Sequence, residues 1–172
     1  MACCPTESAA DQRKKSETSA DEISEQLCTN CESQSKPVSR KTVLIMLKPH
    51  LMEDAMTGTH SFCSTGDCPV VYFEEQGSQR FTTDDLRITV GVKAKTDPIP
   101  VCYCFGFDES HIREEISHTG ATTIPDRISK LIREGSCACE SRNPAGVCCL
   151  GEVNRAATRL KAARNRNQIT KG

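Results

Sequence analysis

The sequence lacks the residues that build a large apolar core. It contains no Trp, and aromatic residues make up only 4% and hydrophobic residues 37% of its 172 residues. A chain of this length suits one compact domain or two small ones. We therefore expect a modest core that needs additional cross-links to be stable.

Signatures of several protein classes are also missing. No apolar stretch is long enough to cross a membrane, and residues 1–8 have neither the basic start nor the apolar run of a secretory signal. The formal net charge of -1 gives no argument for nucleic-acid or membrane binding. A Gly-rich phosphate loop, paired catalytic carboxylates and a Ser-His-Asp order are all absent from the sequence. We expect a cytoplasmic protein that binds neither nucleic acid nor membranes.

Cysteine, in contrast, is abundant and clustered. The twelve cysteines fall into tight groups, which are Cys3 with Cys4, Cys28 with Cys31, Cys63 with Cys68, Cys102 with Cys104, and Cys137, Cys139, Cys148 and Cys149. An even count also suits a secreted disulfide framework, but a reducing cytoplasm favours metal ligation for closely spaced thiols. Bound metal would then supply the cross-links that the core lacks.

Composition divides the chain into segments. Residues 1–25 are polar and charged and predict a disordered tail, residues 26–95 predict a β-rich module, and residues 101–163 predict a helical domain. The connector at 93–100 contains two prolines and predicts an extended, non-helical boundary. Residues 164–172 form a basic tail. The fold class expected is α+β.

Strands are predicted at 70–73 and 86–92, because both segments combine β-branched or aromatic residues with partial alternation. The Gln-Gly-Ser sequence at 76–78 predicts a turn between them. The apolar run at 41–48 is too short for periodicity to distinguish helix from strand.

Three helices are predicted in the second half of the chain. The first begins after the cap candidate Asp108, places Ile112 and Ile116 on one face, and ends at Gly120. The second begins after Thr123 and ends before Gly135. The third begins near Cys149.

The four cysteines of the first half predict a structural zinc site. Two close thiol pairs that bracket strands satisfy the tetrahedral, closed coordination of Zn(II), and these are Cys28, Cys31, Cys63 and Cys68. A redox dithiol at Cys28 and Cys31 is an alternative, although no βαβ pattern surrounds it. His50 or His60 is an alternative zinc ligand.

The cysteines of the second half predict an iron-sulfur centre. Two thiolates in Cys102-Tyr-Cys104 can bind one iron, and a helix-turn-helix after Cys104 returns the chain to supply two more thiolates. This pattern resembles the [2Fe-2S] domain of bacterioferritin-associated ferredoxin (BFD). Gly106, Ile112 and Ile116 fit the resemblance, as does the sequence Cys149-Leu-Gly-Glu-Val.

The closing cysteines depart from that pattern, because a loop at 143–146 separates them. This loop, and the segment 62–73 around the predicted zinc ligands, are similar to the N-terminal domain of CopZ-type copper chaperones, which carries both a zinc site and a BFD-like [2Fe-2S] domain. The resemblance covers roughly residues 28–160. It implies Cys149 as the fourth cluster ligand, and Cys137 by residue count or Cys139 by a shifted loop as the third.

The resemblance implies a protein of electron transfer or metal binding rather than an enzyme. Its cofactors would be a [2Fe-2S] cluster, Zn(II) and, as cargo, Cu(I), and its partners an electron donor or acceptor protein and a metal transporter. The copper-carrying Met-x-Cys-x-x-Cys segment of the chaperones is absent from this sequence. The alternative function is a non-redox or sensory module that holds a soft metal ion through spare thiols such as Cys3, Cys4 and Cys148. His111 and His118 are either additional metal ligands or solvated helix residues.

Overall fold

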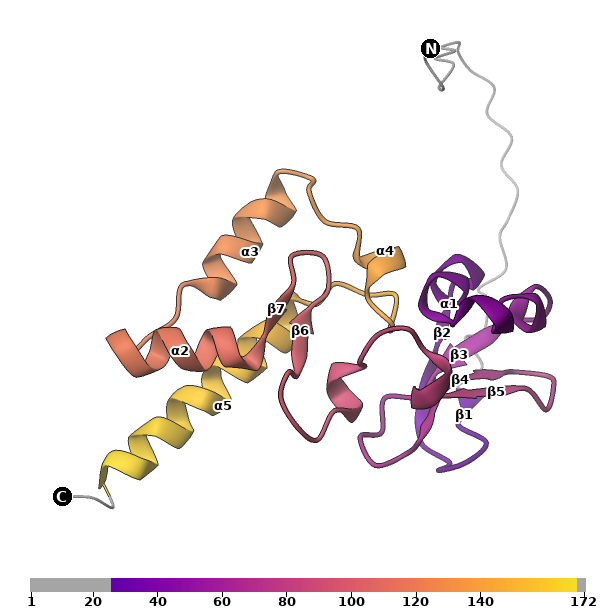
Figure 1. The fold of residues 1–172 in the computed structure, drawn as a ribbon, viewed down its shortest axis with the longest axis horizontal. Coiled ribbons are helices and arrows are strands. Elements are labelled where there is room, and N and C mark those ends of the chain that lie inside the picture. Colours follow the sequence, from indigo (N-terminus) through magenta and orange to yellow (C-terminus); the bar gives the residue numbers. More distant parts are fainter. Residues whose placement is uncertain (1–25, 170–172) are drawn as a thin grey trace, which may run out of the picture.

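A five-stranded antiparallel sheet is followed along the chain by a group of helices (Figure 1), in a computed structural model that describes residues 26–169. The strands of the sheet lie in the order of the sequence and are β1 (Gln26–Leu27), β2 (Gln34–Val38), β3 (His60–Phe62), β4 (Val70–Glu74) and β5 (Arg80–Thr82). The expected α+β class is confirmed. Among the described helices, none is long and apolar enough to span a bilayer.

The central strands of the sheet carry its buried side chains. β4 occupies the segment predicted as a strand at 70–73, and it pairs with β3 through Phe62 and Tyr72. On one side of the sheet, Phe62, Val71 and Tyr72 join Phe81 and Leu86 in the larger apolar core. On the other side, Val70 and Phe73 pack with cysteines instead. The sheet therefore buries apolar side chains against one layer and thiols against the other.

The ambiguous run at 41–48 forms helix α1 (Arg40–Met46). The Ser39 side chain caps its first turn by accepting a hydrogen bond from the backbone of Thr42 at 3.1 Å. Val43, Met46 and Leu47 then pack into the larger core. A local cap, which favours helix over strand, decides what periodicity left open.

The strand predicted at 86–92 was wrong. Leu86 forms only an isolated bridge with Leu47, and the segment then bends into a 3-10 turn, η4 (Gly91–Lys93). Its hydrogen bonds go to the end of α1 instead of to a neighbouring strand, since the Arg87 amide donates to the Met46 carbonyl at 2.9 Å. Ile88 and Val90 pack into the core from a loop, which is a tertiary effect that propensity does not report.

The second half of the chain contains the three predicted helices. They are α2 (Glu109–Thr119), α3 (Ile124–Arg133) and α5 (Leu150–Ile169). Asp108 caps α2 through the Ser110 and His111 amides, and Gly120 ends it with a left-handed φ of 84°. A short hairpin of β6 (Pro100–Cys102) and β7 (Phe107–Asp108) precedes α2. The helices enclose a second core that contains Ile112, Ile116, Ile124, Ile128 and Val153.

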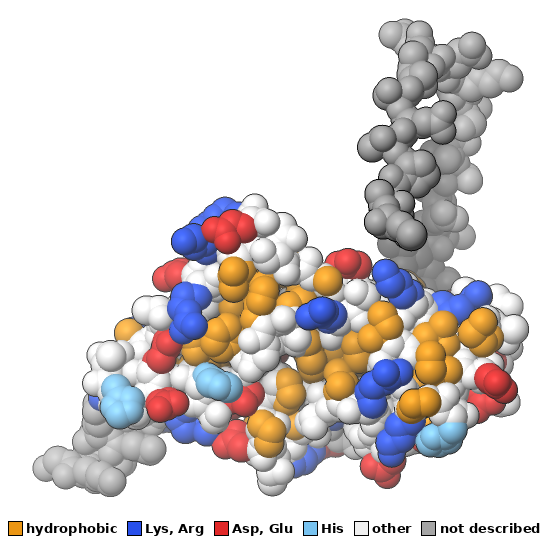
Figure 2. All heavy atoms as spheres, turned by 45° about the horizontal axis from the view of Figure 1, so that its top comes forward, with side chains coloured by type: hydrophobic (Ala, Val, Ile, Leu, Met, Phe, Trp, Pro, Cys, Tyr) orange, Lys and Arg blue, Asp and Glu red, His pale blue; other side chains and the backbone are white. Residues whose placement is uncertain are grey.

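A short helix that the sequence did not predict, α4 (Cys139–Arg142), lies between the two halves and packs against α1 (Figure 1). The Thr42 hydroxyl donates to the Glu140 carbonyl, and the buried Tyr72 hydroxyl donates to the Pro144 carbonyl at 2.7 Å. Figure 2 shows apolar side chains on the visible face running from the helical half across to the sheet half. The loop that carries the last cysteines is therefore fixed to the sheet.

This junction leads to a stability prediction. Tyr72→Phe leaves the buried Pro144 carbonyl without its donor, so the free energy of unfolding should fall by about 1–3 kcal/mol. Urea unfolding of the metal-loaded protein measures this change. Thr158→Ala is the matched control, because it removes an exposed side-chain bond on α5 and should change the value by less than about 0.5 kcal/mol. Equal stability of Tyr72→Phe and the parent protein would show that the contact does not hold the halves together.

Candidate metal centres

The first candidate centre is built by two turns on the thiol-packed side of the sheet. Cys28 and Cys31 lie in the turn between β1 and β2, where Glu32 adopts a left-handed φ of 57° and the Glu32 amide donates to the Cys28 carbonyl at 2.8 Å. Cys63 directly follows β3, and Cys68 lies two residues before the start of β4. Antiparallel pairing of β2, β3 and β4 brings the two turns together.

The four sulfurs of this set converge. All four Sγ atoms lie within 4.8 Å of one another, with Cys28 and Cys68 4.0 Å apart and Cys31 and Cys63 3.6 Å apart. A tetrahedral zinc ion with Zn–S bonds of about 2.3 Å separates its ligand sulfurs by about 3.8 Å. Cys28, Cys63 and Cys68 are buried, and Cys31 is half-buried. The donor set and its spacing fit a closed structural zinc site.

Nearby polar groups stabilise negative charge on these sulfurs. The Asn30 side-chain amide donates to Cys68 Sγ at 3.2 Å. The buried Lys93 ammonium donates to the carbonyls of Thr65 and Cys68 at 2.9 and 3.0 Å, which places a positive charge beside the set. The sequence did not identify Lys93, since a lysine in a polar connector gives no signal of burial.

The thiols differ in acidity. The hydrogen bond with the Thr65 hydroxyl lowers the pKa of Cys31 to about 6, whereas burial raises the pKa of Cys63 to about 12. Metal binding requires all four thiols as thiolates, so the ion would have to displace the Cys63 proton. The site is thus arranged so that a bound cation, rather than the protein alone, ionises its most buried ligand.

His60 does not contribute to this centre. Its ring packs near Phe81, with centroids 6.0 Å apart, and neither ring nitrogen has a hydrogen-bond partner. Burial lowers the pKa of His60, so the ring is held neutral. His50 is exposed on the surface. Neither histidine is a member of the group that meets here, and the four cysteines supply all four ligands of a tetrahedral site.

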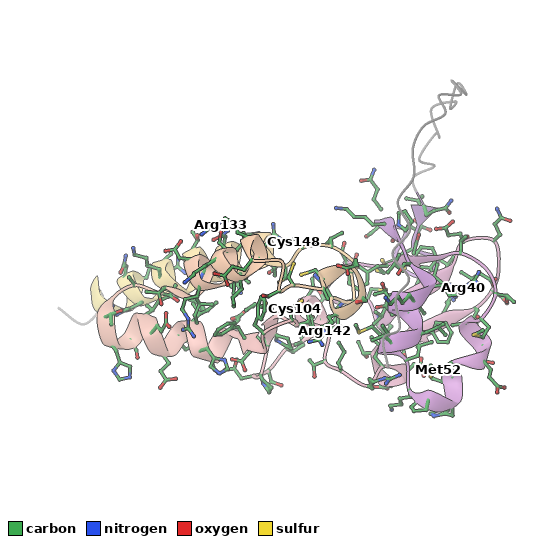
Figure 3. All side chains as sticks on the ribbon, turned by 90° about the horizontal axis from the view of Figure 1, so that it is seen from above. Arg40, Met52, Cys104, Arg133, Arg142 and Cys148 are labelled. Atoms are coloured by element: carbon green, nitrogen blue, oxygen red, sulfur yellow. The ribbon has the colours of Figure 1, made fainter. Side chains whose placement is uncertain are left out.

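The second candidate centre lies where the β6–β7 hairpin, α4 and the start of α5 meet. Cys104 and Cys139 Sγ atoms are 3.6 Å apart, and Cys139 and Cys149 Sγ atoms are 3.9 Å apart. Cys102 is hydrogen-bonded to Cys149. Cys102, Cys139 and Cys149 are buried and Cys104 is half-buried. The four sulfurs therefore form a row of short contacts, from Cys104 through Cys139 and Cys149 to Cys102, that faces the same core (Figure 3 labels Cys104).

The structure places the Cys139 sulfur 3.6 Å from that of Cys104 and 3.9 Å from that of Cys149. Cys137 is half-buried and packs against the same core, and within residues 26–169 its sulfur makes no hydrogen bond to another thiol. The reason is α4, whose first residue is Cys139 and whose packing against α1 turns the chain inward at this point. Counting residues from Cys104 could not reveal that additional helical turn.

Backbone dipoles favour thiolates at this centre. The Ala138 amide donates to Cys104 Sγ at 3.4 Å. Cys149 immediately precedes α5, whose N-terminal end carries partial positive charge. The hydrogen bond with Cys149 lowers the pKa of Cys102 to about 6, and the same contact raises the pKa of Cys149. Four thiols that meet in this way are the donor set that an all-thiolate iron-sulfur cluster would need.

The remaining sequence candidates lie elsewhere. Cys148 is exposed, and Cys3 and Cys4 lie outside the described residues. His111 is exposed at the start of α2, where its ring accepts a hydrogen bond from the Asp108 amide and packs edge-on against Phe107. His118 is exposed on the same helix.

Comparisons with known proteins agree with this geometry. A family described as the CopZ zinc-binding domain matches residues 25–87. The copper chaperone CopZ of Archaeoglobus fulgidus is 32% identical over 129 residues, which are 74% of this chain and 60% of that protein. The chain thus matches about three-fifths of that relative's length.

The X-ray structure of the A. fulgidus CopZ N-terminal domain superimposes with a TM-score of 0.62 at 32% sequence identity, and the match covers 75% of this chain and 95% of that domain. Both the sheet and the helices are therefore included in the comparison. The chain belongs to the family of CopZ N-terminal domains.

Proposed function

We propose that the chain is a zinc- and iron-sulfur-binding redox protein of copper handling. The observation that carries this proposal is the meeting of four sulfurs from three separate segments, which are those of Cys102, Cys104, Cys139 and Cys149. When bound, a [2Fe-2S] cluster supplies reversible one-electron chemistry. The residue pattern resembling bacterioferritin-associated ferredoxin supports this cofactor.

The two halves would have separate tasks. In residues 26–95, Cys28, Cys31, Cys63 and Cys68 would hold zinc and cross-link a sheet that has a small core. In residues 101–163, Cys102, Cys104, Cys139 and Cys149 would hold the cluster, and the half-buried Cys104 would be its most accessible ligand.

The electron would reduce a copper ion before its transfer. The relative's name, copper chaperone, supports copper as the cargo. A soft ion such as Cu(I) prefers thiolate ligands, so reduction of Cu(II) matches the ion to a cysteine-based receptor. An electron-donor protein would pass the electron to the cluster, and a metal transporter would receive the copper.

The assignment of the third cluster ligand leads to a direct prediction. Cys139→Ser should lose most of the bound iron and acid-labile sulfide, because it removes a thiolate from the Cys104 pair. Cys137→Ser is the matched control and should retain iron and sulfide, because the Cys137 sulfur makes no hydrogen bond to the other thiols. Iron and sulfide assays with visible absorption spectra of anaerobically purified variants measure the difference. Loss of iron in Cys137→Ser with retention in Cys139→Ser would reverse the assignment.

The redox function predicts a defined yield of Cu(I). Protein that is reduced with dithionite and freed of excess reductant should convert about one additional Cu(II) to Cu(I) per chain, compared with the oxidised protein. The oxidised sample is the necessary control because free thiols also reduce Cu(II). A chromophoric Cu(I) chelator measures the product. Equal Cu(I) yields from reduced and oxidised protein would refute electron transfer to copper.

A further inference from the structure

The 3-10 turn η4 touches the loops of both candidate metal centres. It lies between the sheet and the β6–β7 hairpin (Figure 1), and it directly follows Val90, which is buried in the larger core. The amides of Lys93 and Ala94 both donate to the Val90 carbonyl, at 2.9 and 3.0 Å. These bonds close the turn on a residue that the core holds in place.

On the side of the first centre, η4 holds the turn that joins β3 to β4. The Lys93 ammonium donates to the carbonyls of Thr65 and Cys68 at 2.9 and 3.0 Å, and Lys93 is only 7% exposed. Gly66, in the same turn, lies so close to η4 that a Cβ atom there would be 3.0 Å from the Val92 carbonyl oxygen. The backbone of the predicted zinc loop therefore packs directly on η4.

On the side of the second centre, η4 contacts the chain before and after Cys102. The Gly91 amide donates to the Tyr103 hydroxyl at 2.8 Å. Tyr103 stands between Cys102 and Cys104, two of the proposed cluster ligands. A Cβ atom on Gly91 would lie 2.0 Å from the Pro100 carbonyl oxygen, so this close approach of η4 to β6 requires glycine. The same three-residue turn is thus fixed to both sets of cysteines.

Charge strengthens the link on the side of the first centre. A zinc ion held by four thiolates carries about two negative charges, and a buried charge needs a partner of opposite sign. The buried Lys93 ammonium is the cation placed beside that set, and within residues 26–169 no carboxylate forms an ion pair with it. A loaded zinc centre would therefore hold Lys93, and with it η4, in this position.

We propose that Lys93 and Tyr103 are positioning residues at the two ends of η4, and that through them zinc at the first centre stabilises the cluster at the second. This inference rests on the proposed function, because it requires both groups to be bound. With zinc in place, Cys63 and Cys68 fix both ends of the turn whose carbonyls accept from Lys93. The turn η4 passes this constraint to Tyr103, and so to the backbone between the two cluster ligands.

Release of cluster iron to a chelator tests this coupling, with anaerobic full-length protein that retains its cluster and is either loaded with zinc or depleted of it. The parent protein should release iron about fivefold or more faster without zinc, since coupling between two sites is typically about 5- to 150-fold. Lys93→Met should reduce this ratio to about one, because a Met side chain has similar length but makes neither hydrogen bond. Tyr103→Phe should do the same from the other end of η4.

Lys95→Met is the matched control. It removes the same charge from the same connector, but Lys95 pairs with Asp67 on the exposed surface, so the ratio should stay at the parent value. A ratio of about one in the parent protein would refute the coupling. A parent-like ratio that persists in either Lys93→Met or Tyr103→Phe would show that the coupling takes another route, and would refute the role of η4.

Zinc affinity gives an independent measurement, because coupling between binding equilibria is reciprocal. In competition with a chromophoric zinc chelator, cluster-loaded parent protein should bind zinc about fivefold or more tightly than cluster-free protein. Tyr103→Phe should abolish this difference, although Tyr103 lies at the other centre, and a purely local role of Tyr103 would leave the difference intact. Equal zinc affinity with and without the cluster would contradict the coupling alone. Protein that assembles no iron and no acid-labile sulfide would instead refute the proposed function, and the coupling with it.

Discussion

The hydrogen bond from the buried Tyr72 hydroxyl to the Pro144 carbonyl is the contact on which the arrangement of the cysteines depends. Pro144 belongs to the loop between Cys139 and Cys149, and Tyr72 belongs to a central strand of the sheet that also positions Cys63 and Cys68. The Thr42 hydroxyl fixes the same loop at Glu140. The sheet therefore supports both groups of thiols, because these contacts join the helical half to it.

Local signals in the sequence were sufficient for most of the fold. Asp108 and Gly120 marked the ends of α2 because capping depends on neighbouring residues. The segment 86–92 could not be predicted, because Ile88 and Val90 reach the core from a loop held by the end of α1. The position of Cys139 beside Cys104 depends likewise on α4 packing against α1, a contact between residues about 100 positions apart, as the Thr42 to Glu140 bond shows.

The two thiol sets are equally buried, with three buried cysteines and one half-buried cysteine in each, but they differ in arrangement. In the first, all four sulfurs surround one point, as a structural ion requires. In the second, the sulfurs form a row of short contacts beside a helix N-terminus. We interpret the first as the cross-link of a small sheet and the second as the redox centre.

Metal and acid-labile sulfide analysis combined with EPR spectroscopy of the anaerobically purified protein tests the central claim most directly. The account predicts zinc together with two irons and two sulfides per chain, and an EPR signal of a reduced [2Fe-2S] cluster that appears with dithionite and disappears on oxidation. Zinc without iron or acid-labile sulfide would contradict it, and the second thiol set would then require another role.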